Sequence, residues 1–479
     1  MPPSTAQLDA QILYLVAQQL ANDVETEGSI GIDSGCRFFR TARYTLRTLR
    51  LTCRYFAKMG IINSVLFGHI TLRATQKQLS RVLEMSFAWI GRFVTEVTFK
   101  PSLCSPEVTL ADFELIKAIY KCQLSPSHLF RTAQWQEIWH MYPQAGSHFP
   151  AVMGNFKAAY IFYTKCAIND MNIVQNGSLQ RAWITVLKTF SNASSFVIGN
   201  VPGFWPVWVY DYDIAPNQQC VFCEENIGAL SKMSSFGEGM LFRAVTECLA
   251  SAHVRIGNLM LDCNVLRADK LEDLWISQLR LDQMTQLTLY EAPYFLCQPL
   301  EVDEEIENQS IRRAGLLSSA LVKGAQNSLR VLSIENSEKD NVSHIPWHRH
   351  LDMNLPALRS LCLTNVIFPV AMLERTLEEC RRLRCLHWEV CVFFDDSGPS
   401  KTFFNAIRQH PNLLQLHFRN LLSWEGGCDV ELQNCQIFSE PTPLPGSLEG
   451  EYEMQKSLRL YLAGQGEWDD HLQRWFPED

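Results

Sequence analysis

The sequence lacks the features that would place the protein in a membrane or on nucleic acid. No run of apolar residues approaches the ~20 that a transmembrane helix needs, and the first residues, 1–4, lack the basic and apolar regions of a secretory signal. The 479 residues include 42 basic and 51 acidic side chains. This balance does not favour attraction to nucleic acid or to an anionic membrane surface. We therefore expect a protein of the cytoplasm, the nucleus or both.

The sequence also lacks the local motifs of common enzymes: it has no Walker loop, GxGxxG, G-x-S-x-G or HExxH. Cys220 and Cys223 form a CxxC without the second pair that would complete four zinc ligands. His344, His348 and His350 have no adjacent carboxylate or cysteine. We interpret both groups as parts of loops, and we expect no catalytic residue, no metal site and no cofactor. An enzyme with a site assembled from distant residues is the alternative.

The N-terminal part of the sequence contains two amphipathic helical patterns. In the first, apolar residues recur at three- and four-residue spacing, namely Leu8, Ile12, Leu15, Val16 and Leu20. In the second, the apolar stripe consists of Leu46, Leu49, Cys53 and Phe56. A short third apolar block follows at 61–67. Because three such helices bury too little surface to be comfortably stable alone, they need a partner or a docked neighbour.

The order of these blocks, 8–13, 49–56 and 65–73, resembles an F-box of the form common in fungal F-box proteins. The sequence departs from that family where Asp9 replaces the usual proline, and where an acidic, Gly/Ser-rich insertion occupies 22–36. The resemblance implies an F-box domain at 5–75 that binds a Skp-type adaptor. By the same resemblance, the residues for apolar docking and internal packing are Leu8, Ile12, Leu13, Leu49, Cys53, Phe56 and Leu66. An ordinary helical subdomain is the alternative.

A repeated Leu-x-x-Leu-x-Leu pattern follows the helices. Its clearest copies begin at Leu329, Leu358, Leu383 and Leu413, which are 29, 25 and 30 residues apart, close to the ~20–29 of leucine-rich repeats. Weaker copies lie at 94–99, 196–200, 254–258 and 284–289, and helical patterns lie at 179–190, 241–249, 371–379 and 403–409. This alternation predicts parallel strands stacked in one direction, with helices over one face. A doubly wound α/β domain is the alternative.

The repeats also predict individual contacts. We expect the following residues to point inward from adjacent parallel strands: Leu332, Ile334, Leu361, Leu363, Leu386, Leu416 and Phe418. The asparagines after three of the copies, Asn336, Asn365 and Asn420, should bond backbone groups that a curving chain leaves unsatisfied. The acidic run at 301–307 is interpreted as a solvated loop.

These patterns predict the α/β fold class, with an N-terminal three-helix F-box (5–75), an irregular leucine-rich-repeat-like α/β solenoid (76–463) and a C-terminal tail (464–479). Together the resemblances imply the substrate-recognition subunit of an SCF-type (Skp–cullin–F-box) ubiquitin ligase. Such a receptor performs no bond chemistry and acts by proximity. A repeat scaffold without a ligase role is the alternative.

The region that would bind a target protein is predicted from tryptophans. An exposed indole offers a large contact area with few rotors to freeze, which suits a binding anchor. The candidates lie in two loops between repeats and are Trp205, Trp208 and Trp347. The competing interpretation is that these indoles are buried and seal the core.

Overall fold

A nine-stranded parallel sheet is the main feature of the computed structural model. The structure describes residues 14–19, 45–51, 54–84, 87–100, 109, 156–199, 241–263, 276–291, 304–336, 347, 354–366, 370–389, 400–419, 427–431, 436–437 and 451–476. Within these residues each strand pairs with the strand that precedes it and the strand that follows it in the sequence, and the sheet does not close on itself. The fold is therefore α/β with a repeat-like architecture, as the leucine pattern predicts.

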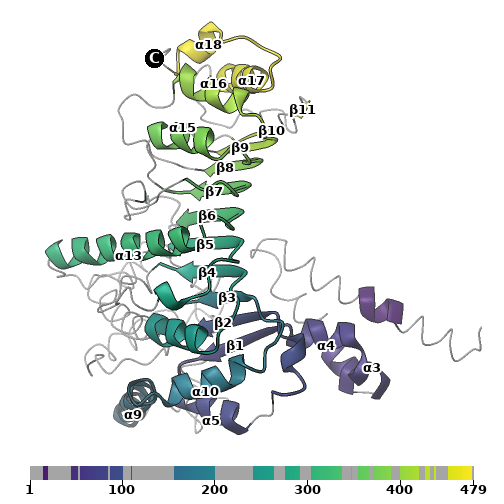
Figure 1. The fold of residues 1–479 in the computed structure, drawn as a ribbon, viewed down its shortest axis with the longest axis vertical. Coiled ribbons are helices and arrows are strands. Elements are labelled where there is room, and N and C mark those ends of the chain that lie inside the picture. The colour runs from purple at the N-terminus through teal and green to yellow at the C-terminus, as the bar shows by residue number, and fades with distance from the viewer. Residues whose placement is uncertain are drawn as a thin grey trace, which may run out of the picture.

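The parallel strands form a vertical stack (Figure 1). They are β1 (His69–Arg73), β2 (Glu96–Lys100), β3 (Ser195–Ile198), β4 (Asn258–Asp262), β5 (Gln286–Glu291), β6 (Val331–Asn336), β7 (Ser360–Thr364), β8 (Cys385–Glu389) and β9 (Gln415–Arg419). The stack ends with β10 (Gly427–Glu431), which is antiparallel to β9, and β11 (Gln436–Ile437), which is antiparallel to β10. The parallel series therefore ends at β9.

A continuous backbone ladder fixes the spacing between the strands. In each step, the carbonyl of the residue before one strand accepts N–H groups from two consecutive residues at the start of the next strand. The carbonyl of Arg330, for example, accepts from Arg359 at 2.7 Å and from Ser360 at 2.9 Å. Eight such steps run from the carbonyl of Gly68 to the N–H groups of Leu414 and Gln415. The same geometry recurs although the connections between strands differ greatly in length.

Helices lie along one side of the strand stack (Figure 1). They include α9 (Phe156–Gln175), α10 (Ser178–Leu187), α13 (Glu304–Gly324), α15 (Val370–Glu379) and α16 (Lys401–Gln409). The helical segment 241–251 belongs to the same series. Short 3₁₀ turns, η1 (Gly91–Phe93) and η4 (Ile276–Gln278), precede β2 and β5. No helix among the described residues is long and apolar enough to cross a membrane.

The core lies between the sheet and these helices. Register places Leu332 beside Leu361, Leu361 beside Leu386, and Leu386 beside Leu416 on consecutive strands. A second row runs through Ile334, Leu363, Trp388 and Phe418. All of these side chains whose exposure is described are buried. The predicted adjacency of these residues on parallel strands is confirmed, and the burial is confirmed for all but Phe418, whose side chain is outside the described part.

The asparagine prediction is confirmed at Asn365. This residue is buried, has a positive φ of 53°, and donates from Nδ2 to the carbonyl of Asn336 at 2.9 Å. Asparagine tolerates this left-handed backbone better than most residues. Its side chain therefore joins the end of β7 to the end of β6.

Helices cover the C-terminal end of the sheet. α17 (Glu451–Leu462) packs against α16 and β10, and α18 (Asp470–Gln473) packs against α17. Phe404 of α16 lies 4.9 Å from Phe476, and Tyr461 of α17 lies 5.0 Å from Trp468, measured between ring centroids. The sequence interpretation assigned residues 464–479 to a C-terminal tail. Residues 464–476 instead contribute buried side chains such as Leu472 to the core.

Several elements differ from the sequence interpretation. The segment 69–73, expected within the helical N-terminal domain, is the first strand of the sheet. The repeat expected at 254–258 is placed too early, because β4 begins at Asn258. The acidic run at 301–307 is not a loop throughout, since α13 begins at Glu304. Acidic residues are favourable at the N-terminus of a helix, where the macrodipole is positive.

Candidate functional site

The N-terminal helices enclose a small apolar cluster of their own. The described segments are 14–19, 45–51, α3 (Arg54–Lys58) and α4 (Gly60–Phe67). The buried members of the cluster are Ala17, Leu46, Phe56, Met59 and Ile62, and partly buried Leu49, Ile61, Val65 and Leu66 pack around them. Of the residues predicted to bind an adaptor or to pack this unit, the structure therefore brings Leu49, Phe56 and Leu66 together. The predicted Leu8, Ile12, Leu13 and Cys53 lie outside the described residues.

An arginine joins this helical unit to the start of the sheet. The guanidinium carbon of Arg50 lies 5.0 Å from the ring centroid of Phe67 and 5.1 Å from that of Trp89. Its Nε also donates to Oδ1 of Asn63 at 3.1 Å. A cation held between two rings favours one arrangement of the helices, α4 and the η1 turn. The helical unit is therefore attached to the sheet by specific contacts.

The same helices leave apolar side chains in solvent. Leu15 is 61% exposed and Leu51 is 72% exposed, and Tyr14 and Val16 are each 47% exposed. Leu15 and Val16, which belong to the apolar stripe of the first helical pattern, thus face solvent, while Ala17 is buried. Four large apolar side chains exposed within two short segments are a feature of a surface that binds another protein.

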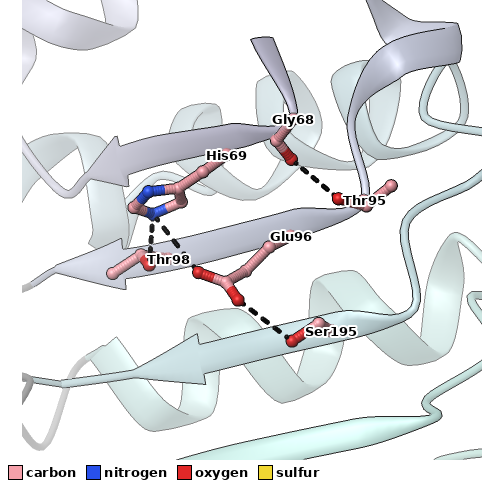
Figure 2. Close-up of polar contacts among 6 residues, drawn as sticks. All are labelled: Gly68, His69, Thr95, Glu96, Thr98 and Ser195. Carbon is pink, nitrogen blue, oxygen red and sulfur yellow. Dashed lines mark hydrogen bonds and ion pairs between the residues drawn. The ribbon is translucent and has the colours of Figure 1, made fainter. Parts of the chain in front are cut away.

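The sheet presents a second surface, which we call the polar face: the side of the strands opposite the inward-facing leucines. At its N-terminal end, side chains from β1, β2 and β3 interact (Figure 2). Nε2 of His69 lies 2.8 Å from Oγ1 of Thr98 and 3.7 Å from Oε1 of Glu96. Oγ of Ser195 donates to Oε2 of Glu96 at 3.3 Å. Glu96 therefore bridges the strands on either side of it.

The order of these groups does not match a hydrolase triad. In a triad the imidazole lies between the hydroxyl and the carboxylate, so that it can accept the hydroxyl proton. Here Glu96 lies between Ser195 and His69 (Figure 2). The carboxylate, and not the imidazole, is therefore the group that accepts the hydrogen bond of Ser195. With His69 and Glu96 each about 40% exposed, at 44% and 40%, the pair suits polar contacts with a ligand better than acyl transfer.

Further along the polar face, histidines replace the hydroxyl groups. His387 of β8 and His417 of β9 stack with ring centroids 4.2 Å apart and an interplanar angle of 7°. Cys362 of β7 is the cross-strand neighbour of His387. Burial raises the pKa of the Cys362 thiol, so this sulfur is not a ready nucleophile despite the nearby imidazole.

Three more cysteines, Cys380, Cys248 and Cys166, are poor nucleophiles for the same reason. Burial raises the pKa of the Cys380 thiol to about 11, and burial likewise raises the pKa of Cys248 and of Cys166. Six of the described cysteines are free thiols, namely Cys166, Cys248, Cys263, Cys362, Cys380 and Cys385. Among those same residues no group of three His, Cys, Asp or Glu side chains could hold a metal ion. The pair Cys220 and Cys223 and the three clustered histidines at 344–350 lie outside the described part of the chain.

Of the three tryptophans predicted to bind a target, only Trp347 lies within the described residues, so only its exposure to solvent can be given. Trp347 is fully buried in the main core. This agrees with the competing interpretation, in which the indole seals the core. A side chain without exposed surface cannot anchor a partner, so Trp347 is removed from the target-binding prediction. Trp205 and Trp208 lie outside the described residues, and their role stays a prediction.

The polar-face residues were missed in the sequence interpretation. His69, Glu96 and Ser195 occupy the first position of three adjacent strands, yet 99 residues separate Glu96 from Ser195. Only the strand register brings them together.

Comparison with models of known protein families finds none that matches this sequence, and comparison with curated proteins finds no match.

Proposed function

We propose that this protein is the substrate-recognition subunit of an SCF-type ubiquitin ligase. In this proposal the N-terminal helices form an F-box that binds a Skp-type adaptor, and the sheet region presents a target protein. The observation that carries the proposal is the pairing of an exposed apolar surface on the N-terminal helices with an attached repeat-like sheet. Of the three blocks that resemble an F-box, 49–56 and 65–67 include residues of these helices, 69–73 form β1, and 8–13 lie outside the described residues.

The exposed residues are important because they are available without unfolding the helical unit. The apolar cluster of Phe56 and Ile62 provides internal packing, whereas Leu15 and Leu51 are turned to solvent. Burying a fully exposed leucine in an interface contributes roughly 1.5–3 kcal/mol. The leucines on this surface could therefore supply much of the affinity for an adaptor.

The receptor itself needs no catalytic group in this proposal. It would act by proximity, because it holds a target near the ubiquitin-charged enzyme of the assembly. The arrangement of His69, Glu96 and Ser195 is compatible with that role, since it offers polar contacts and does not reproduce a triad. A deep catalytic site is not required to explain the residues described above.

The test is adaptor binding by exposed-leucine variants of the full chain. Leu15→Asp and Leu51→Asp should each weaken binding to a purified Skp-type adaptor by about tenfold or more, because each removes an apolar contact and adds a charge to it. Binding is measured by biolayer interferometry. Leu83→Asp is the matched control, because Leu83 is 70% exposed but lies on α5 (Gln76–Glu84).

Two results would contradict the proposal. One is absence of saturable binding between the wild-type protein and the adaptor. The other is equal loss of binding in the Leu51 and Leu83 variants, which would show that an added charge anywhere has the same effect. If the wild-type chain does not bind the adaptor, the repeat scaffold without a ligase role becomes the better hypothesis.

A further inference from the structure

Three arginines occupy equivalent positions along the edge at which the strands begin. Arg330, Arg359 and Arg384 are the residues immediately before β6, β7 and β8, and all three side chains are exposed. Arg381 and Arg382, also exposed, precede Arg384 in the same turn. We call these five residues the arginine rim. It concentrates positive charge on a protein whose net charge is −9.

The backbone ladder holds the three equivalent arginines in line. The N–H of Arg359 donates to the carbonyl of Arg330, and the N–H of Arg384 donates to the carbonyl of Arg359, each at 2.7 Å. Adjacent strands are about 4.8 Å apart, so the three side chains begin from points that span roughly 10 Å. The position of each charge is therefore set by the fold and not by a flexible loop.

Among the residues that the structure describes, none neutralises the three guanidinium groups. Within the described part of the chain, no hydrogen bond or ion pair is made by the guanidinium groups of Arg330, Arg359 or Arg384. Two unit charges at this spacing repel by roughly 1 kcal/mol in water. A bound anion would reverse the sign of that interaction, and the flat guanidinium group can form two parallel hydrogen bonds to a carboxylate.

We propose that the arginine rim binds an acidic, extended segment of a partner protein. Alternate residues of an extended chain point the same way and are about 6.6–7 Å apart, a distance that flexible arginine side chains can match from their 4.8 Å spacing. Three carboxylates could therefore each meet one guanidinium group. A nucleic acid fits less well, because its many phosphates would also meet the negative field of the whole chain.

This inference concerns the target-binding half of the proposed function, and it names the chemistry of a target. It rests on the proposed function only for the identification of the bound protein as a ligase target. The rim and the N-terminal helices are different parts of the molecule (Figure 1). Peptide binding and adaptor binding can therefore be measured separately on the same purified chain.

The probe is a fluorescein-labelled 12-residue peptide of alternating Glu and Ser, and its binding to the full-length protein is followed by fluorescence anisotropy. A peptide of alternating Gln and Ser is the uncharged control. The variant carries Arg330→Glu, Arg359→Glu and Arg384→Glu together. The matched control carries Arg243→Glu, Arg312→Glu and Arg474→Glu, which changes the net charge equally at exposed positions away from the rim.

We expect saturable, salt-sensitive binding of the Glu/Ser peptide by the wild-type protein. The rim variant should lose at least tenfold in affinity, whereas the matched control should stay within threefold of wild type. Circular dichroism should be the same for all three proteins, because every substituted side chain is exposed. Adaptor binding by the rim variant should equal that of wild type.

The proposal is overturned if the wild-type protein does not bind the Glu/Ser peptide, or if both triple variants lose affinity equally. It is also overturned if a single-stranded 12-mer oligodeoxynucleotide binds the rim more tightly than the peptide. Retained adaptor binding in these cases would leave the proposed function standing. Peptide binding by the rim without any adaptor binding would instead support the inference and contradict the ligase proposal.

Discussion

Replacement of Asn365 by Ala should destabilise the sheet by an amount that the structure allows us to divide into two parts. The substitution removes the hydrogen bond from Nδ2 to the carbonyl of Asn336. Leaving a buried polar group without its partner costs about 1–3 kcal/mol. Alanine must also adopt the positive φ of 53° found at this position, which costs roughly 1–2 kcal/mol. We therefore expect the free energy of unfolding to fall by about 2–5 kcal/mol.

A matched control is available elsewhere in the repeats. Asn412 donates from Nδ2 to the carbonyl of Arg381 at 2.7 Å, but this bond is exposed to solvent. It also joins one repeat to the preceding one, and Asn412 has no positive φ. Because water can replace an exposed hydrogen bond, Asn412→Ala should change the free energy of unfolding by no more than about 0.5 kcal/mol.

The assay is urea unfolding followed by tryptophan fluorescence, with equal m-values required for the comparison. A third variant, Asn365→Asp, separates the hydrogen bond from the backbone conformation, because aspartate also tolerates a positive φ. Its carboxylate would face the carbonyl of Asn336 in a buried site, so the pKa of this carboxyl should be raised. The variant should then recover stability relative to wild type as the pH falls and the group gains a proton. Equal effects of the Asn365 and Asn412 alanine variants would refute the reasoning.

Two further predictions follow from individual contacts. A Cβ at Gly68 would overlap the backbone oxygen of Ser64, whereas a Cβ at Gly60 would meet nothing within 4 Å. Gly68→Ala should therefore lower the urea midpoint of unfolding, and Gly60→Ala should leave the midpoint equal or raise it. A lower midpoint in both variants would contradict the steric argument. Burial lowers the pKa of His410, whose Nε2 lies 3.3 Å from the carbonyl of Cys380. Because the unfolded state binds the proton more readily, the contribution of His410 is fully present above the ordinary pKa of about 6.5 and is lost as the pH falls toward the lower folded value. The change in urea midpoint between pH 5 and pH 7.5 should thus be smaller in His410→Gln than in wild type or in the exposed control His471→Gln. The same change in all three proteins would show that His410 does not cause the pH dependence of stability.

The strands β6 to β9 could be predicted residue by residue because their leucines follow one spacing. The buried positions of Leu332, Leu361 and Leu386 are fixed by that spacing and by the alternation of side chains along a strand. The earlier strands have less leucine, and β4 was misplaced because Val254 and Ile256 imitate the start of a repeat. The weaker copies at 94–99, 196–200 and 284–289 still coincide with β2, β3 and β5, so among these copies the local pattern misplaced only that of β4.

The elements that could not be predicted have different causes. α9 exposes Ile161 and Ile168 while it buries Ala167 and Ile173, so no single apolar stripe marks it as an amphipathic helix. α13 begins within an acidic run that also suits a loop. The contacts of the polar face depend on register between segments far apart in the sequence, which no local pattern reports.

The arginine rim did leave a signal in the sequence that the interpretation overlooked. In three successive repeats the first leucine is followed by arginine, at 329–330, 358–359 and 383–384. Aligning the repeats would have placed these arginines in one column. The exposure of that column, and its lack of neutralising partners among the described residues, could be learned only from the structure.

The junction at Gly68 has a mechanical consequence. α4 ends at Phe67 and β1 begins at His69, so along the chain a single residue separates the N-terminal helices from the first strand, and the contact of Arg50 with Trp89 joins the same two parts. Eight strand spacings separate β1 from β9, which is a lever of about 38 Å. A rotation of only 5° at Gly68 would move the far end of the sheet by roughly 3 Å over that length. A partner bound to the N-terminal helices would therefore also set the orientation of the distant strands, and a more flexible junction would make that orientation less well defined.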